Sequence, residues 1–95
     1  MIMADELIQL RKSIDNIDNA IVAMFAERFK VTDKIGQLKA EQGLPAKDPQ
    51  RESLQFERIE QLAGLYELDV DFAKAYLTTV IEKVVANLLK ISSDH

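Results

Sequence analysis

The fold is decided by one stretch, residues 5–42, which reads DELIQLRKSIDNIDNAIVAMFAERFKVTDKIGQLKAEQ. Its apolar residues recur at spacings that alternate between three and four, a pattern typical of one side of a single long helix. They are Leu7, Leu10, Ile14, Ile17, Ile21, Met24, Val31, Ile35 and Leu38. Arg28 occupies the one position in this apolar stripe that is not apolar. A guanidinium among apolar side chains is costly unless an anion meets it, so Arg28 is the first candidate site residue.

The stretch predicts a helix over residues 5–41, because Gly43 and Pro45 then stop the helical pattern. At ~1.5 Å per residue this helix is about 55 Å long. A compact domain of this size has a radius of gyration of about 13 Å, so the rest of the chain cannot cover the apolar stripe. We therefore expect a homodimer in which a second copy, related by a two-fold axis, packs on the stripe.

The remaining sequence predicts two shorter helices, over residues 49–65 and 70–91. Asp48 followed by Pro49 is a typical helix start, and Asp69 is the next acidic N-cap candidate. The residues expected to face inward are Phe56, Ile59, Leu62 or Ala63, and Tyr66 on the first, and Ala73, Tyr76, Leu77, Val80, Ile81, Val84, Leu88 and Ile91 on the second. The prediction is an all-α fold, a single domain over residues 1–95.

Composition excludes several classes of function. A net charge of −4 argues against a nucleic-acid binder, and the chain has no cysteine for thiol or thiolate-metal chemistry. The one histidine is His95, the last residue, so a histidine base or metal ligand is not credible. The start MIMADELIQL is not typical of a signal peptide, and no apolar run reaches the roughly 20 residues that span a bilayer. We expect a cytoplasmic protein that uses no metal and no cofactor and binds no membrane.

The cations of the long helix suggest an anion site. Lys39 lies about 20° around the helix from Arg28 and about 16 Å along it, so both can reach one small anion. Arg11 lies about 42 Å from Lys39 on the same rod, so it can join that site only from a second copy. Arg51 and Glu52 follow in the first turn after Asp48, where free backbone N–H groups favour an anion.

Each of these residues also has a purely structural interpretation. Arg11 can extend its guanidinium into water, and Lys39 near a helix end can simply complement the dipole. Asp48 can be an ordinary cap, and Arg51 can be solvated. Arg28 can pair with Glu52 or another buried acid, so the pattern alone favours an anion site only slightly over a structural ion pair.

The chain resembles the all-helical chorismate mutases of the bacterial, stand-alone type over essentially its whole length. The resemblance is carried by LRKSIDNID near the start, Glu27-Arg28, IGQLK, and DPQRE from Asp48 to Glu52. It implies an intertwined homodimer with two sites shared between the chains. It also implies rearrangement of chorismate to prephenate, on the route to phenylalanine and tyrosine, without a cofactor.

The resemblance further implies the role of each site residue. Arg28 and the partner's Arg11 would hold the two carboxylates, and Lys39 would meet the ether oxygen. Asp48 and Glu52 would meet the ring hydroxyl, and Arg51 would support a carboxylate or order the loop. On the last helix, where the family usually has a serine and a glutamine, this chain departs from the pattern. The three residues there that can line the site are Val84, Asn87 and Leu88.

This departure keeps alternatives open. Asn87 can replace the missing donor to the ether oxygen, Lys39 can serve that oxygen largely alone, or Asn87 can be a solvated edge residue. The alternative activity is that of an isochorismate–pyruvate lyase of the same fold. A non-catalytic helical dimer that partners another shikimate-pathway enzyme is the third possibility, favoured by the apolar Val84 and Leu88.

Overall fold

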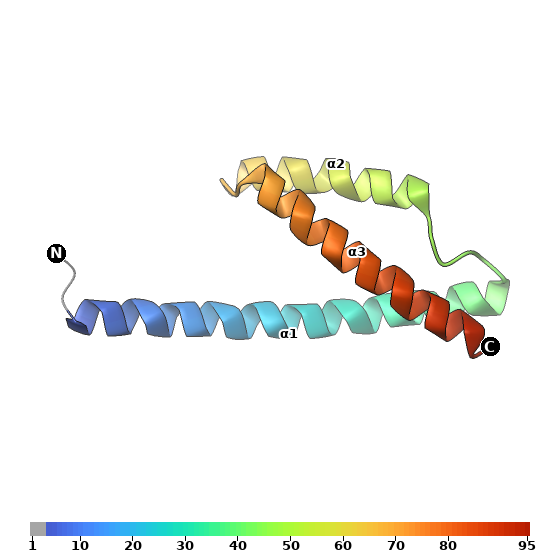
Figure 1. The fold of residues 1–95 in the computed structure, drawn as a ribbon, viewed down its shortest axis with the longest axis horizontal. Helices are drawn as coiled ribbons and strands as arrows, with labels where there is room; N and C mark the ends of the chain where they lie inside the picture. The colour runs from blue at the N-terminus through green and yellow to red at the C-terminus, as the bar shows by residue number, and fades with distance from the viewer. Residues whose placement is uncertain (1–3) are drawn as a thin grey trace. The chain divides into compact units, whose positions relative to one another are not determined.

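The computed structural model describes residues 4–95, which fold into three helices without strands (Figure 1). They are α1 (Ala4–Gln42), α2 (Pro49–Leu65) and α3 (Val70–Ser93). The all-α prediction is confirmed, and the helix ends differ from the expected ones by at most two residues. Residues 1–3, which the predicted domain includes, lie outside the described residues. None of the described helices combines the length and the apolar character that crossing a membrane requires.

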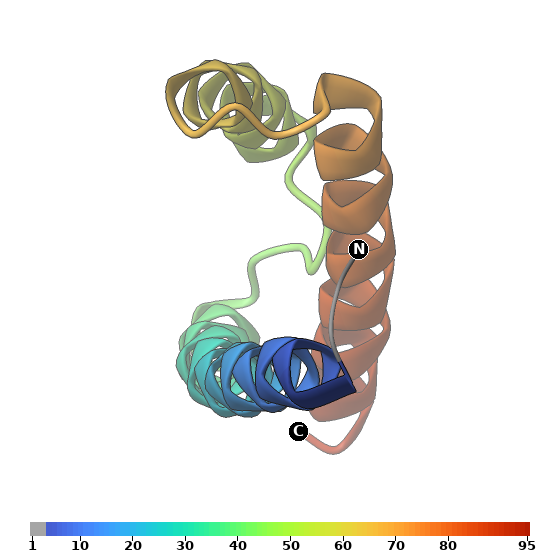
Figure 2. The ribbon, with the colours of Figure 1, turned by 90° about the vertical axis from the view of Figure 1, so that its left-hand side faces the viewer.

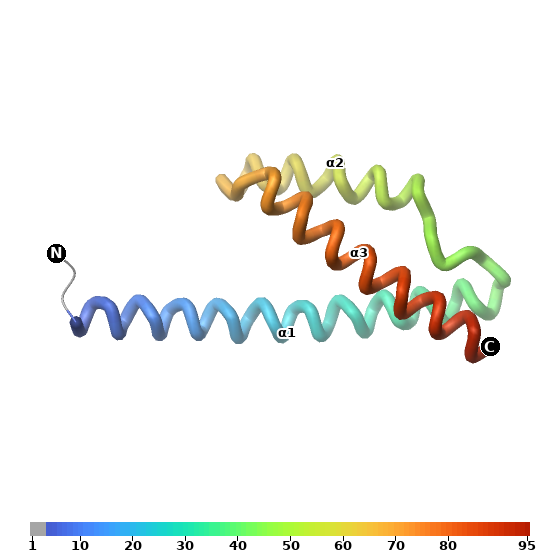
Figure 3. Tube along the Cα trace, viewed as in Figure 1, coloured from blue at the N-terminus to red at the C-terminus, as the bar shows by residue number. Residues whose placement is uncertain are grey.

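The chain divides into two compact units, Met1–Val31 and Thr32–His95, of which residues 4–31 and 32–95 are described. In the first, the helical backbone is regular throughout the described residues (Figure 3). Phe25 and Phe29 stack one turn apart, with ring centroids 6.3 Å apart. The apolar stripe of this unit is exposed to solvent, from 41% at Leu7 to 70% at Met24. Its side chains therefore contribute little burial within the single chain.

The second unit contains the core. Here α2 and α3 converge at the turn between them and separate away from it (Figures 1 and 2). The buried apolar residues are Ala63, Ala73, Leu77, Val80 and Leu88. Small residues such as Ala63 and Ala73 let the two backbones approach closely at the turn. The inward face predicted for α3 is confirmed, since all eight of its expected residues are buried or half-buried.

An ion pair ties α2 to α3 at the surface. Lys74 Nζ lies 2.7 Å from Glu60 Oε1. The hydrogen bond and the attraction of the Glu60 carboxylate raise the pKa of Lys74 above its ordinary value. Because the raised pKa belongs to the folded state, the pair stabilises the fold at neutral pH. The contribution of the lysine is lost as the pH rises through the raised value.

The helix ends follow from identifiable capping residues. The Asp48 carboxylate accepts a hydrogen bond from the Arg51 N–H, and the Asp69 carboxylate accepts one from the Asp71 N–H. Both predicted N-caps are thereby confirmed. The prediction that Tyr66 faces inward is wrong: it is the C-cap residue of α2, 74% exposed, because the helix ends before the apolar spacing does.

Gly36 is the buried residue of α1. A Cβ at this position would lie 3.1 Å from the side chains of both Leu88 and Ile91, which belong to α3. The absence of a side chain therefore lets the last turns of α1 receive the end of α3. This contact fixes the part of α1 that carries Lys39 against the rest of the second unit.

Candidate functional site

The loop after α1 begins with a tight turn that needs a glycine. Gly43 adopts a φ of 67°, and the Leu44 N–H donates to the Lys39 carbonyl oxygen at 2.8 Å. Together with the bond from the Gly43 N–H to the Ala40 oxygen at 3.3 Å, this is a Schellman termination. The turn at Gly43 ends α1 one turn after Lys39, and the following loop comes within hydrogen-bond distance of the Lys39 ammonium at Ala46.

Residues 46–48 of this loop bring four predicted site residues together. Lys39 Nζ donates to the Ala46 carbonyl oxygen at 3.3 Å, with the lysine half-buried. Asp48 Oδ1 accepts from the backbone N–H of Arg51 at 3.1 Å, which starts α2. Glu52 lies in the first turn of α2, and its backbone N–H donates to the Asp48 carbonyl oxygen at 3.0 Å. Lys39, Asp48, Arg51 and Glu52 thus belong to one connected segment of the second unit.

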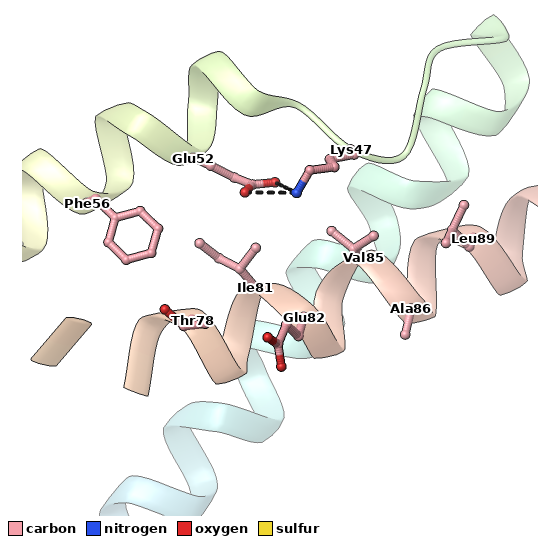
Figure 4. Close-up of a pocket in the computed structure, with 9 residues that line it drawn as sticks. All are labelled: Lys47, Glu52, Phe56, Thr78, Ile81, Glu82, Val85, Ala86 and Leu89. Carbon is pink, nitrogen blue, oxygen red and sulfur yellow. Dashed lines mark hydrogen bonds and ion pairs between the residues drawn. The ribbon is translucent and has the colours of Figure 1, made fainter. Parts of the chain in front are cut away.

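The fifth group in this cluster is Lys47, between Ala46 and Asp48. Its ammonium donates to both carboxylate oxygens of Glu52, at 3.2 and 3.1 Å (Figure 4). Along the chain, this segment carries the three cations Lys39, Lys47 and Arg51 and the two carboxylates of Asp48 and Glu52, an excess of one positive charge. A cluster with excess positive charge and two acceptors suits an anion that also carries a hydroxyl group.

A cavity of about 390 Å³ opens beside this cluster, where α2 and α3 separate. Its lining combines an apolar wall with the Lys47–Glu52 pair and a second glutamate (Figure 4). The lining residues are Lys47, Glu52, Phe56, Thr78, Ile81, Glu82, Val85, Ala86 and Leu89. The volume lies in the range of small-molecule sites, and a mostly apolar lining with a few polar groups is typical of them.

The other two predicted cations belong to the first unit. Arg11 is exposed, and Arg28 is half-buried. The Nη1 nitrogen of Arg28 is buried and has no hydrogen-bond partner among the described residues. A buried guanidinium nitrogen without an acceptor is costly, so this atom is the strongest sign of a missing anionic partner. Within the second unit, Glu52 pairs with Lys47; a pairing of Arg28 with Glu52 or with another acid stays the structural alternative.

The three predicted lining residues of α3 lie outside the lining of this cavity. Leu88 is buried, 4% exposed, and packs at Gly36 of α1. Val84 and Asn87 are half-buried. The α3 residues that line the cavity include Val85, Ala86 and Leu89, each one position from a predicted residue. A contribution of Val84, Asn87 or Leu88 to a substrate site stays a prediction.

Two groups of the cluster were not singled out from the sequence, the Lys47 side chain and the Ala46 carbonyl. A loop carbonyl has no sequence signal. Lys47 has a weak sequence signal, because the side chain of a lysine just before an N-cap can extend over the first helical turn. There it can meet an acidic residue such as Glu52.

Fold and site together define an all-helical protein with a mixed cation and carboxylate cluster beside an apolar cavity. The profile of the family described as chorismate mutase type II matches residues 10–87. The chain belongs to this family, whose members are isomerases.

The chain is also similar to several curated relatives. It is 32% identical to a chorismate mutase of Methanocaldococcus jannaschii, over 84% of this chain and 81% of that protein. It is 43% identical to a bifunctional chorismate mutase/prephenate dehydratase of Aquifex aeolicus, over 61% of this chain and 16% of that protein. A T-protein of Haemophilus influenzae is 36% identical, over 68% of this chain and 18% of its own length. The chain thus spans most of the first relative and less than a fifth of the other two.

Proposed function

We propose that this chain binds chorismate as a dianion and rearranges it to prephenate through Arg28, Lys39 and the residues around Asp48. The observation that carries the proposal is the buried Arg28 Nη1, which lacks an acceptor. A substrate carboxylate supplies two oxygens in the planar arrangement that a guanidinium matches. Family membership gives the substrate class, and the cation cluster gives the charge to hold it.

The reaction requires no group that gives or takes a proton. In a [3,3] rearrangement the ether C–O bond breaks while a C–C bond forms, and negative charge develops on the ether oxygen. The protein therefore accelerates the step by holding a compact substrate conformer and by stabilising that charge. A chain whose one histidine is its last residue and which has no cysteine is suited to this kind of catalysis.

Lys39 is the residue to which we assign the ether oxygen. Its ammonium makes a hydrogen bond of 3.3 Å to the Ala46 carbonyl, longer than the usual N–H···O distance of about 2.9–3.0 Å. An oxygen that becomes negatively charged is a better acceptor than a neutral carbonyl. The ammonium can therefore turn to the ether oxygen as charge develops, while the loop carbonyl keeps it close.

The carboxylates of Asp48 and Glu52 are assigned to the ring hydroxyl. Asp48 uses one oxygen to cap α2, and the second remains available to accept from a hydroxyl. Arg51 lies one turn from the cap with its side chain exposed, and we assign it to a substrate carboxylate or to ordering of the loop.

The test is incubation of the purified protein with chorismate and, separately, with isochorismate. We expect chorismate absorbance to fall and prephenate to form, with isochorismate unchanged. Formation of salicylate and pyruvate from isochorismate, with chorismate untouched, would identify a lyase instead. No turnover of either substrate would leave the non-catalytic dimer as the function.

The proposal includes a homodimer, in which the partner's Arg11 completes each site. Its support is the exposed stripe of α1, where Ile14, Ile17 and Ile21 are 56%, 58% and 45% exposed. Contiguous exposed apolar residues on this scale are typical of an interface. We expect sedimentation equilibrium at micromolar concentration to give twice the 10.8 kDa mass of the chain. Ile17→Glu should shift the species toward monomer, whereas Lys12→Glu, on the same helix, should not; a monomeric native chain contradicts the proposal.

A further inference from the structure

The Lys47–Glu52 pair is built differently from an ordinary surface ion pair. One ammonium donates to both oxygens of one carboxylate, at 3.2 and 3.1 Å. The carboxylate is well covered, since the Glu52 side chain is 21% exposed, while the Lys47 side chain is 61% exposed. The lysine therefore reaches from the solvent side onto a carboxylate that belongs to the cavity wall (Figure 4).

The surroundings of Glu52 strengthen this contact. Phe56 and Ile81 line the same cavity, and apolar neighbours reduce the local dielectric. A free glutamate has several rotatable bonds and a spread of positions. Two charge-assisted hydrogen bonds to one ammonium confine the carboxylate to a narrow range. Each carboxylate oxygen keeps a further lone pair that can accept from a hydroxyl group.

The backbone around Lys47 is held as well. Ala46, before it, accepts from Lys39, and Asp48, after it, caps α2. The lysine is thus anchored at both neighbours, and its ammonium contacts the Glu52 carboxylate. A fixed anchor and a bidentate contact are what a positioning residue requires.

We propose that Lys47 is a positioning residue for the substrate hydroxyl, acting through the carboxylate of Glu52. The proposal rests on the proposed function, in which Glu52 accepts from the ring hydroxyl. That hydroxyl forms and breaks no bond in the rearrangement, so we expect its contact to be about equally strong in the ground state and in the transition state. Loss of positioning then raises KM and leaves kcat unchanged.

A double-mutant cycle with chorismate as the substrate tests this. Lys47→Met should raise KM about five- to tenfold with kcat within twofold of the native chain. The same substitution in a Glu52→Gln background should change KM less than twofold, because there is no carboxylate left to position. Lys47→Arg should restore KM to within twofold. Lys34→Met, at an exposed lysine of α1, is the matched control and should change nothing.

Each other outcome overturns the positioning role. An equal rise in KM in both backgrounds means that Lys47 contacts the substrate itself. An unchanged KM in Lys47→Met means that the pair has no role in binding, while turnover by the native chain keeps the proposed function intact. A fall in kcat together with a lower Tm means that Lys47 serves only the fold. A native chain that does not turn over chorismate overturns the proposed function, and the positioning role with it.

Discussion

Replacing Arg28 with methionine is expected to lower kcat/KM for chorismate about 10³-fold while leaving the Tm unchanged or higher. The two effects have opposite signs because the guanidinium serves the ligand and not the fold. Its Nη1 is buried without an acceptor, so in the free protein no hydrogen bond offsets the cost of its desolvation. Methionine restores the apolar spacing of the stripe and is an unbranched side chain. The substitution therefore removes a desolvation penalty without removing a hydrogen bond that Nη1 makes in the free protein. Chorismate absorbance and a thermal melt provide the two measurements.

The controls for Arg28 separate charge from shape. Arg28→Lys keeps the charge but loses the planar pair of donors, so we expect a loss of about tenfold to a hundredfold in kcat/KM. Arg58→Met, at an exposed arginine of α2, should leave activity unchanged. A parallel fall of activity and Tm in Arg28→Met would contradict the anion site and indicate a structural ion pair instead.

The parts of the fold that the sequence predicts are those fixed by local rules. The alternating spacing of three and four identifies α1, and Asp48 and Asp69 mark the starts of α2 and α3 because a capping carboxylate satisfies backbone donors close in sequence. Tyr66 is mispredicted because periodicity carries no information on where a helix stops. There the chain turns through Glu67 at a φ of 56°, a conformation that non-glycine residues rarely adopt.

The parts that the sequence does not predict depend on tertiary contact. Leu88 sits at a position where the resemblance suggests a site residue, yet in the structure it packs at Gly36. No pattern within α3 reveals that neighbour. From the sequence, Lys47 is simply a lysine in a loop. Its proposed positioning role follows only from the two hydrogen bonds that it donates to Glu52. Arg28 is the exception: its misfit in an apolar stripe is visible in the sequence, and the structure adds the buried, unpartnered nitrogen.

Replacing Lys39 with alanine is expected to lower kcat about 10²- to 10³-fold with little change in KM, because the contact to the ether oxygen strengthens only as charge develops there. The Ala46 carbonyl, which accepts from Lys39 at 3.3 Å, provides no alternative donor. Lys34→Ala, on the same helix and exposed, is the matched control. Lys39→Gln retains a neutral amide NH2 that can donate, and it should recover part of the loss. The measurement is the full dependence of rate on chorismate concentration, since kcat and KM must be separated.

Asn87→Ala decides whether Lys39 acts alone. Asn87 is half-buried on α3 and lies outside the lining of the cavity between α2 and α3. If Lys39 is the sole donor to the ether oxygen, Asn87→Ala leaves kcat within twofold, and its combination with Lys39→Ala adds nothing. A tenfold or larger fall in kcat for Asn87→Ala would instead make the amide a second donor. The sum of the free-energy losses of the two single variants would then exceed the loss of the double variant. Residues that stabilise one developing charge act as a unit, so their effects are not additive. The double variant therefore distinguishes a site that relies on one cation from a site in which an amide replaces the family's usual polar residue.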